Sequence, residues 1–142
     1  MASITVNINT TYFYDFETNT HFVTVDAGGT KEVTRGDTIT FRYNSRGTSS
    51  VTPPVVIAGF DSSVFTNTSN ITLSSVGASV TKTIKSDASY ITDTLNLTAT
   101  YSSGVGSDTL GIRVLNPVDN VPDSFSLGPN RTGFPAGQTI QL

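Results

Sequence analysis

The sequence predicts an all-β fold, an antiparallel β-sandwich, and three observations support this prediction. Apolar and polar residues alternate along several short segments, which is the pattern of a strand with one buried face. Clusters of Gly, Ser, Asn and Asp separate these segments, as turns do. No window of the sequence shows a sustained 3.6-residue period of apolar residues, which an amphipathic helix would require. We therefore expect seven or eight strands between residues 3 and 116.

Four segments show the alternation most clearly. Apolar residues occupy alternate positions in residues 3–8, 37–43, 94–101 and 109–114. Shorter strands are expected at 23–25, 55–57, 71–73 and 80–84, and turns at 26–30, 44–50, 74–79 and 102–108. Strands and turns of this spacing are typical of two antiparallel sheets packed face to face.

One charged residue falls on an apolar face of this pattern. Lys82 shares its alternating face with Val80 and Ile84. A charge that points inward among apolar neighbours is one way in which proteins prevent an edge strand from pairing with another chain. We therefore interpret residues 79–85 as an edge strand.

Composition and charge exclude several classes of partner and chemistry. The net charge is −3 and the eight basic residues are scattered, so the chain could not neutralise several phosphates of a nucleic acid at once. The chain has no Cys, which excludes disulfides, thiolate chemistry and Cys-type zinc sites. No stretch approaches the roughly 20 apolar residues that span a bilayer, and no signal peptide is recognisable. We expect neither nucleic acid nor a membrane as a partner.

The low content of charged residues is informative about the surface. Charged residues form 13% of the chain, against about 25% in an average soluble protein. Hydroxyl and amide groups must therefore cover much of the surface. Such surfaces are common among β-rich extracellular and virion proteins.

A near repeat divides the chain. The segment GDTITF, residues 36–41, reappears as GQTIQL at residues 137–142, and the two copies begin 101 residues apart. This spacing is close to the roughly 100 residues of one immunoglobulin-like sandwich. We expect an immunoglobulin-like domain at residues 1–116, a linker with two prolines at 117–123, and the start of a second β module or an exchanged strand at 124–142.

The sequence resembles the immunoglobulin-like modules of bacteriophage virion proteins. The resemblance rests on GDTITFRY, SVTKTIKS, DTLNLTATYSSGVGSDTLGIRV and the restart VPDSFSL, which together cover most of residues 30–127. It implies an immunoglobulin-like β-sandwich in a structural component of the virion, such as a capsid decoration protein or part of a tail appendage. It names no binding residue.

The segment TYFYDF contains four aromatic residues, namely Tyr12, Phe13, Tyr14 and Phe16. Strand alternation places Phe13 on one face and the two tyrosines on the other. Exposed aromatic rings are good anchors at protein interfaces and can also stack on sugars, whereas buried rings would only pack in the core. We select these four residues as a candidate protein interface, together with the apolar residues of the C-terminal segment, Phe134, Ile140 and Leu142.

The linker offers the only candidate metal site. Asp119, Asn120 and Pro122 have a spacing that is partly similar to that of the calcium-binding linkers of cadherins, and the candidate ligands are Asp119, Asn120 and Asp123. Calcium takes six to eight oxygen ligands, several of them charged, and two carboxylates are few for this purpose. An ordinary turn built by Asp, Asn and Pro is the alternative, so we expect no cofactor, with linker-bound calcium as the exception to be tested.

Nothing in the sequence indicates an enzyme. His21 is the only histidine, and no Gly-x-Ser-x-Gly nucleophile motif follows a strand. The tripeptide Arg35-Gly36-Asp37 matches a cell-adhesion motif, but its position directly before an expected strand favours a turn.

The leading functional hypothesis is a non-enzymatic virion structural protein, either an outer capsid decoration or cement protein or the N-terminal anchoring part of a tail fibre. Its partners would be other capsid or tail proteins and further copies of itself, after assembly in the bacterial cytoplasm. Host-surface glycans could be bound by later modules. The alternatives are a repeat of an adhesin on the bacterial cell surface and a carbohydrate-binding module.

Overall fold

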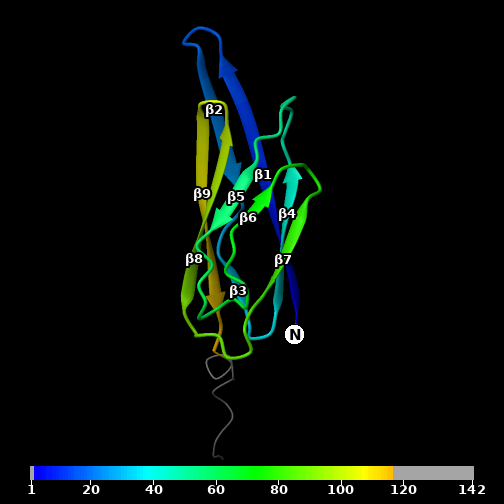
Figure 1. Cartoon of the computed structure of the whole chain (residues 1–142), viewed down its shortest axis with the longest axis vertical. Helices are drawn as coiled ribbons and strands as arrows, with labels where there is room; N and C mark the ends of the chain where they lie inside the picture. Colours follow the sequence, from blue (N-terminus) through cyan, green and yellow to red (C-terminus); the bar gives the residue numbers. More distant parts are fainter. Residues whose placement is uncertain (1, 117–142) are drawn as a thin grey trace, which may run out of the picture.

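A computed structural model describes residues 2–116 of the chain. These residues form nine strands and no helix, as Figure 1 shows. The strands are β1 (Ser3–Asp15), β2 (Thr20–Asp26), β3 (Lys31–Val33), β4 (Thr38–Ser45), β5 (Val55–Ala58), β6 (Ile71–Leu73), β7 (Ser79–Thr83), β8 (Thr92–Tyr101) and β9 (Gly104–Val114). The predicted all-β class is confirmed, and the described residues include no helix long and apolar enough to cross a bilayer.

The strands form two sheets. One sheet has the order β2-β1-β4-β7, and the other has the order β3-β9-β8-β5-β6. Two neighbouring pairs, β1 with β4 and β3 with β9, are parallel, so the prediction of purely antiparallel sheets is wrong. The reason for the first pair is that β2 and β3 return the chain to the end where β1 began. There the amide of Thr38 donates to the carbonyl of Ala2 over 3.0 Å.

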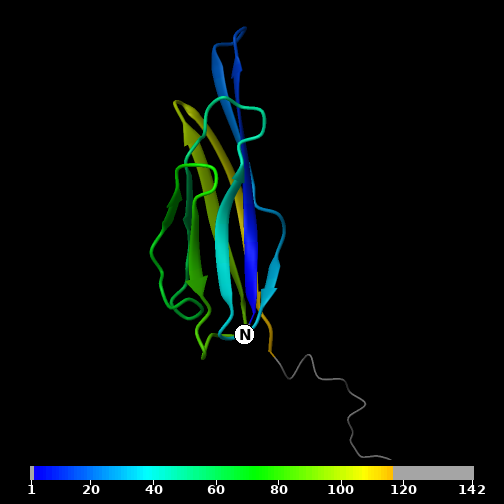
Figure 2. The same ribbon diagram turned by 90° about the vertical axis from the view of Figure 1, so that its right-hand side faces the viewer.

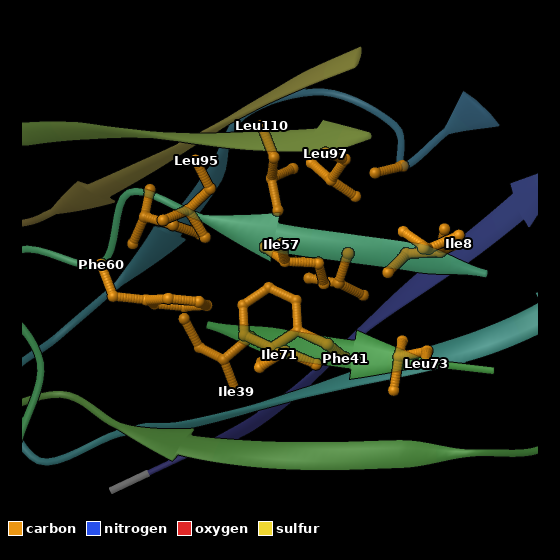
Figure 3. Packing of buried hydrophobic residues seen from close by; sticks show 14 of the residues in the cluster. Ile8, Ile39, Phe41, Ile57, Phe60, Ile71, Leu73, Leu95, Leu97 and Leu110 are labelled. Atoms are coloured by element: carbon orange, nitrogen blue, oxygen red, sulfur yellow. The ribbon is translucent and has the colours of Figure 1, made fainter. Parts of the chain in front are cut away.

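The two sheets pack around one hydrophobic core. Every second residue of the long strands points inward, for example Val6 and Ile8 in β1 and Leu95 and Leu97 in β8. Figure 3 shows side chains from both sheets meeting in this layer, including Phe41. Each Å² of apolar surface that is buried stabilises the fold by about 25 cal/mol. This layer is therefore the main source of stability, since the described residues contain no disulfide.

Three boundaries differ from those expected. The first strand continues through the aromatic segment to Asp15, because its alternation is not interrupted there. The turn expected at 102–108 is much shorter, since β9 already begins at Gly104 and Ser102 adopts a left-handed backbone with φ of 52°. The strand β3, residues Lys31–Val33, was not expected because it contains a single apolar residue, Val33, and therefore shows no alternation. It brings the number of strands in the described residues to nine.

On one side of the molecule the two sheets approach each other closely. A Cβ atom added at Gly106 of β9 would lie 2.1 Å from the carbonyl oxygen of Val23 in β2. Near the end of β2, the amide of Ala27 donates to Oδ2 of Asp108 over 3.0 Å. We call this the closed side.

On the opposite side each sheet of the described residues ends in a strand that has a neighbouring strand on one side only. The edge strands there are β7 and β6, which confirms the interpretation of residues 79–85 as an edge strand. Lys82 points inward and is only 4% exposed, as expected from its place in the alternation. We call this the open side.

Candidate protein interface

A long hairpin formed by β1 and β2 projects beyond the rest of the molecule, at the end opposite the N-terminus (Figures 1 and 2). Its strands are paired from Asn9 with Asp26 to Asp15 with Thr20. In its turn, Oδ1 of Asp15 accepts the amide of Glu17 over 2.9 Å, and Asn19 adopts φ of 59°. The backbone hydrogen bond from Glu17 lowers the pKa of the Asp15 carboxyl. Strand pairing and turn hydrogen bonds therefore continue up to the tip of the hairpin.

The inner face of the hairpin carries a cluster of aromatic rings. The hydroxyl of Tyr12 is hydrogen-bonded to Nδ1 of His21 over 2.6 Å, and its ring packs edge-on against Tyr101 of β8 with a centroid distance of 4.9 Å. The ring of Tyr14 lies 4.8 Å from that of His21, and its hydroxyl donates to Oδ1 of Asn19. His21 thus belongs to a packed aromatic cluster that stiffens the hairpin.

The outer face of the hairpin exposes two phenylalanines, and a third is exposed at its turn. Phe13 and Phe22 lie directly opposite each other in the strand pairing and are 53% and 48% exposed. Phe16 follows at the turn and is 86% exposed, and its ring packs edge-on against Tyr14. This contact places Phe16 beside the tyrosines, so we call only Phe13 and Phe22 the phenylalanine patch.

The predicted interface residues separate into two groups. Phe13 is exposed on one face and Tyr12 and Tyr14 are half-buried on the other, so alternation correctly divided these residues but did not say which face is free. Phe16 is exposed at the turn, beside Tyr14. Phe22 was missed. Its signal was present, because Val23 and Val25 were expected to point inward, which places Phe22 on the outer face.

The remaining predicted site residues lie outside the described residues. This applies to the interface candidates Phe134, Ile140 and Leu142 and to the calcium candidates Asp119, Asn120 and Asp123. Within residues 2–116 no group of three or more His, Asp or Glu side chains could hold a metal ion.

The adhesion-like tripeptide is a structural turn. Gly36 adopts φ of 84°, and Asp37 is only 3% exposed. The carboxylate of Asp37 accepts the amides of Ala2 over 2.7 Å and Thr34 over 2.8 Å. Burial raises the pKa of Asp37, but these backbone donors outweigh it and hold the pKa below its ordinary value. Asp37 therefore fastens the start of β1 to the turn before β4.

When compared with known proteins, the chain matches no family model and no curated protein.

Proposed function

We propose that the chain is a non-enzymatic assembly module that binds another protein through its projecting hairpin. The observation that carries the proposal is the phenylalanine patch, two exposed aromatic rings that lie opposite each other on the outer face of the hairpin. Contiguous exposed apolar surface on a soluble protein marks an interaction site, and aromatic residues are enriched in interface cores.

The construction of the hairpin supports this role. Its backbone is fixed by strand pairing, and its inner face is held by the cluster of Tyr12, Tyr14 and His21. A partner that binds the outer face would therefore order few groups of this chain on binding. Preorganisation of this kind increases affinity because it lowers the entropic cost of association.

The finer fold assignment, an immunoglobulin-like sandwich, is part of the proposal. In immunoglobulin domains strands C, F and G are neighbours in one sheet, and strands B and E in the other. The neighbours β5-β8-β9 and β4-β7 correspond to these two groups when β4 is taken as strand B. The departure is β1, which is inserted between β2 and β4 and has no counterpart in that scheme.

For the biological setting we propose a bacteriophage virion. The supports are the surface rich in hydroxyl and amide groups and the resemblance of the sequence to virion modules. The chain would act as a capsid decoration or cement protein, or as the N-terminal anchoring part of a tail fibre. Its partners would be other virion proteins and further copies of itself, and the assembled form would be part of the particle.

The test is cofractionation with purified particles. The native chain should remain on salt-washed particles, while a variant with both Phe13→Ser and Phe22→Ser should stay in the free fraction although it is folded. The variant Val76→Ser removes an apolar side chain that is 45% exposed but lies in the loop before β7, and it should bind like the native chain. A native chain found only in the free lysate would contradict the proposal.

A carbohydrate-binding module is the second candidate, because the Phe13–Phe22 pair offers adjacent rings on which a sugar could stack. The same variants separate the two functions. Saturating oligosaccharide should protect the hairpin amides from exchange in the native chain if sugars are bound there. Unchanged exchange across a panel of glycans would leave protein binding as the function of the patch.

A further inference from the structure

The open side has an unpaired stretch of backbone. Among the described strands β7 pairs only with β4, through residues 79–83. At the C-terminal end of β7, the edge that faces away from β4 is covered. There the amide of Thr66 donates to the carbonyl of Thr83, and Phe65 forms a bridge with Ile84. Within residues 2–116, no strand lies beside residues 79–82 on this edge.

Beside this free edge lies a groove of about 280 Å³ between β6 and β7. Its lining includes Ile71 of β6 and Val80 and Lys82 of β7. Val80 is 38% exposed although it shares the inward face of β7 with Lys82. An apolar side chain entering this groove would cover the uncovered part of Val80.

The chain contains a segment that fits this edge. The existing partner of β7 is β4, where Ile39 lies opposite Lys82 and Phe41 opposite Val80, both pointing into the core. The near copy GQTIQL at residues 137–142 has Ile140 and Leu142 at the corresponding positions. As a strand it would present these two side chains on one face and polar residues on the other.

The direction and reach of the chain favour its own β7 over that of a neighbour. The chain leaves β9 at the end of the molecule where β7 also ends, so a strand that starts there runs antiparallel to β7 (Figure 1). The twenty residues 117–136 can span up to about 70 Å, whereas β1, the longest strand described, measures about 43 Å. A segment tethered at this length has an effective concentration in the millimolar range.

We propose that residues 137–142 add to the free outer edge of β7 in the same chain as an antiparallel strand. Ile140 and Leu142 occupy the groove over Ile71 and Val80, while Thr139 and Gln141 face solvent. The added strand extends the sheet to the order β2-β1-β4-β7 plus one strand and covers the open side. This inference does not depend on the function of the phenylalanine patch at the far end of the molecule.

Disulfide trapping tests the pairing, because the native chain has no Cys. If the register of β4 is repeated, Gln141 lies opposite Thr81, at a Cα separation of about 5.5 Å that a disulfide can bridge. The full-length double variant Thr81→Cys, Gln141→Cys should form an intramolecular disulfide under mild oxidation, detected by mass spectrometry of the monomer. The control Thr24→Cys, Gln141→Cys places the first Cys on β2, at the opposite edge of the same sheet.

Preferential trapping at Thr81, by about tenfold over the control, is the expected result. Equal trapping in the two variants, or none in either, would overturn the proposal. Trapping only between two chains would overturn the assignment to the same chain.

Hydrogen exchange gives a second test without engineered cysteines. The amide of Thr81 points to the outer edge, because the alternate residues Val80 and Lys82 face β4 in the ladder. In the full chain Ile140→Asp should accelerate exchange at Thr81 about tenfold, since the strand would be released. Gln141→Asp adds the same charge on the solvent face and should leave the exchange rate at Thr81 within about twofold of that in the native chain. Equal exchange in the native chain and Ile140→Asp would overturn the proposal.

Discussion

The two sides of the molecule solve the same structural problem in different ways. Each sheet must end somewhere, and unpaired edges invite contact with other chains. On the closed side β2 and β9 meet backbone to backbone at Val23 and Gly106. On the open side β6 and β7 stay apart, with a groove between them.

The closed side depends on the absence of side chains. Three glycines of β9 lie where a Cβ atom would meet neighbouring atoms at 3.1 Å or less, and they are Gly104, Gly106 and Gly111. The open side instead contains a buried ammonium group. Nζ of Lys82 donates to the carbonyl of Ser69 over 2.7 Å, to Oδ1 of Asn67 over 2.6 Å and to its carbonyl over 3.2 Å. Backbone contact leaves no room for another strand on the first side, whereas the groove on the second side can accept one.

The largest effect should follow from a methyl group on the closed side. Gly106→Ala places a Cβ atom 2.1 Å from a backbone oxygen that cannot rotate away, so the two sheets must separate locally. Overpacking of a tight interior costs 1–3 kcal/mol and more where the backbone must move, so we expect a loss of about 3 kcal/mol in the free energy of unfolding. Denaturant unfolding with a circular dichroism signal measures it.

Gly29→Ala is the matched control, because no atom lies within 4 Å of the added Cβ. This variant should unfold within about 0.5 kcal/mol of the native chain or be slightly more stable. If Gly106→Ala were equally harmless, the close approach of β2 and β9 would be wrong, and with it the contrast between the two sides.

Much of this architecture follows from the sequence, and the part that does not has a physical reason. Alternation located the long strands because each has one buried face, as for Ile39 and Phe41 in β4. It could not give the order of strands in a sheet, which depends on contacts between distant segments. The parallel pair β1–β4 therefore escaped prediction. Residues 102–108 were predicted as a turn, whereas β9 already begins at Gly104. The sequence alone does not distinguish a glycine that allows close packing of two strands from a glycine that forms a turn.

The second-largest loss in the free energy of unfolding should follow from removal of the hydrogen bond across the closed side. Asp108→Ala removes the acceptor of the Ala27 amide, and Ala27 is itself only 2% exposed. A buried donor left without an acceptor costs about 1–3 kcal/mol, so we expect a loss near 1 kcal/mol because Asp108 is only half-buried.

Asp108→Asn retains a carbonyl oxygen for the same amide and should lose about half as much or less in thermal unfolding at pH 7. Equal losses in the two variants would mean that charge, and not the hydrogen bond to Ala27, carries the effect of Asp108.

The candidate interface was predictable in part for the same reason as the strands. The four aromatic residues of the segment TYFYDF predicted a candidate interface, and alternation placed Phe13 on the face opposite its tyrosine neighbours. The projection of the hairpin was not predictable, because it depends on where β4 ends beside β1, at Ser45 opposite Asn9. Beyond Asn9 only β2 accompanies β1 in its sheet, so the hairpin extends past the end of β4.

The smallest effect at neutral pH should come from the open side. Lys82→Met keeps most of the aliphatic stem and removes the ammonium group with its three hydrogen bonds. The abandoned acceptors belong to the exposed residues Asn67 and Ser69 and can bind water, while removal of a buried charge ends a desolvation cost. Because these two consequences oppose each other, we expect the free energy of unfolding at pH 7 to change by less than about 1 kcal/mol.

The pH dependence of the same variant is the sharper measurement. Burial lowers the pKa of Lys82 below its ordinary value of 10.5. Between the folded pKa and 10.5 the unfolded chain binds more protons at this residue than the folded chain, so the native protein gains stability as pH rises through this window. Lys82→Met lacks this gain. The unfolding free energy of the native chain minus that of Lys82→Met should therefore increase as pH rises through this window. Lys85→Met, which removes an ammonium group on a 36% exposed side chain, serves as the control. A native-minus-Lys82→Met difference that stays flat up to pH 10.5 would show that the ammonium group is hydrated in solution, and the open side would then be more accessible than the contacts of Lys82 indicate.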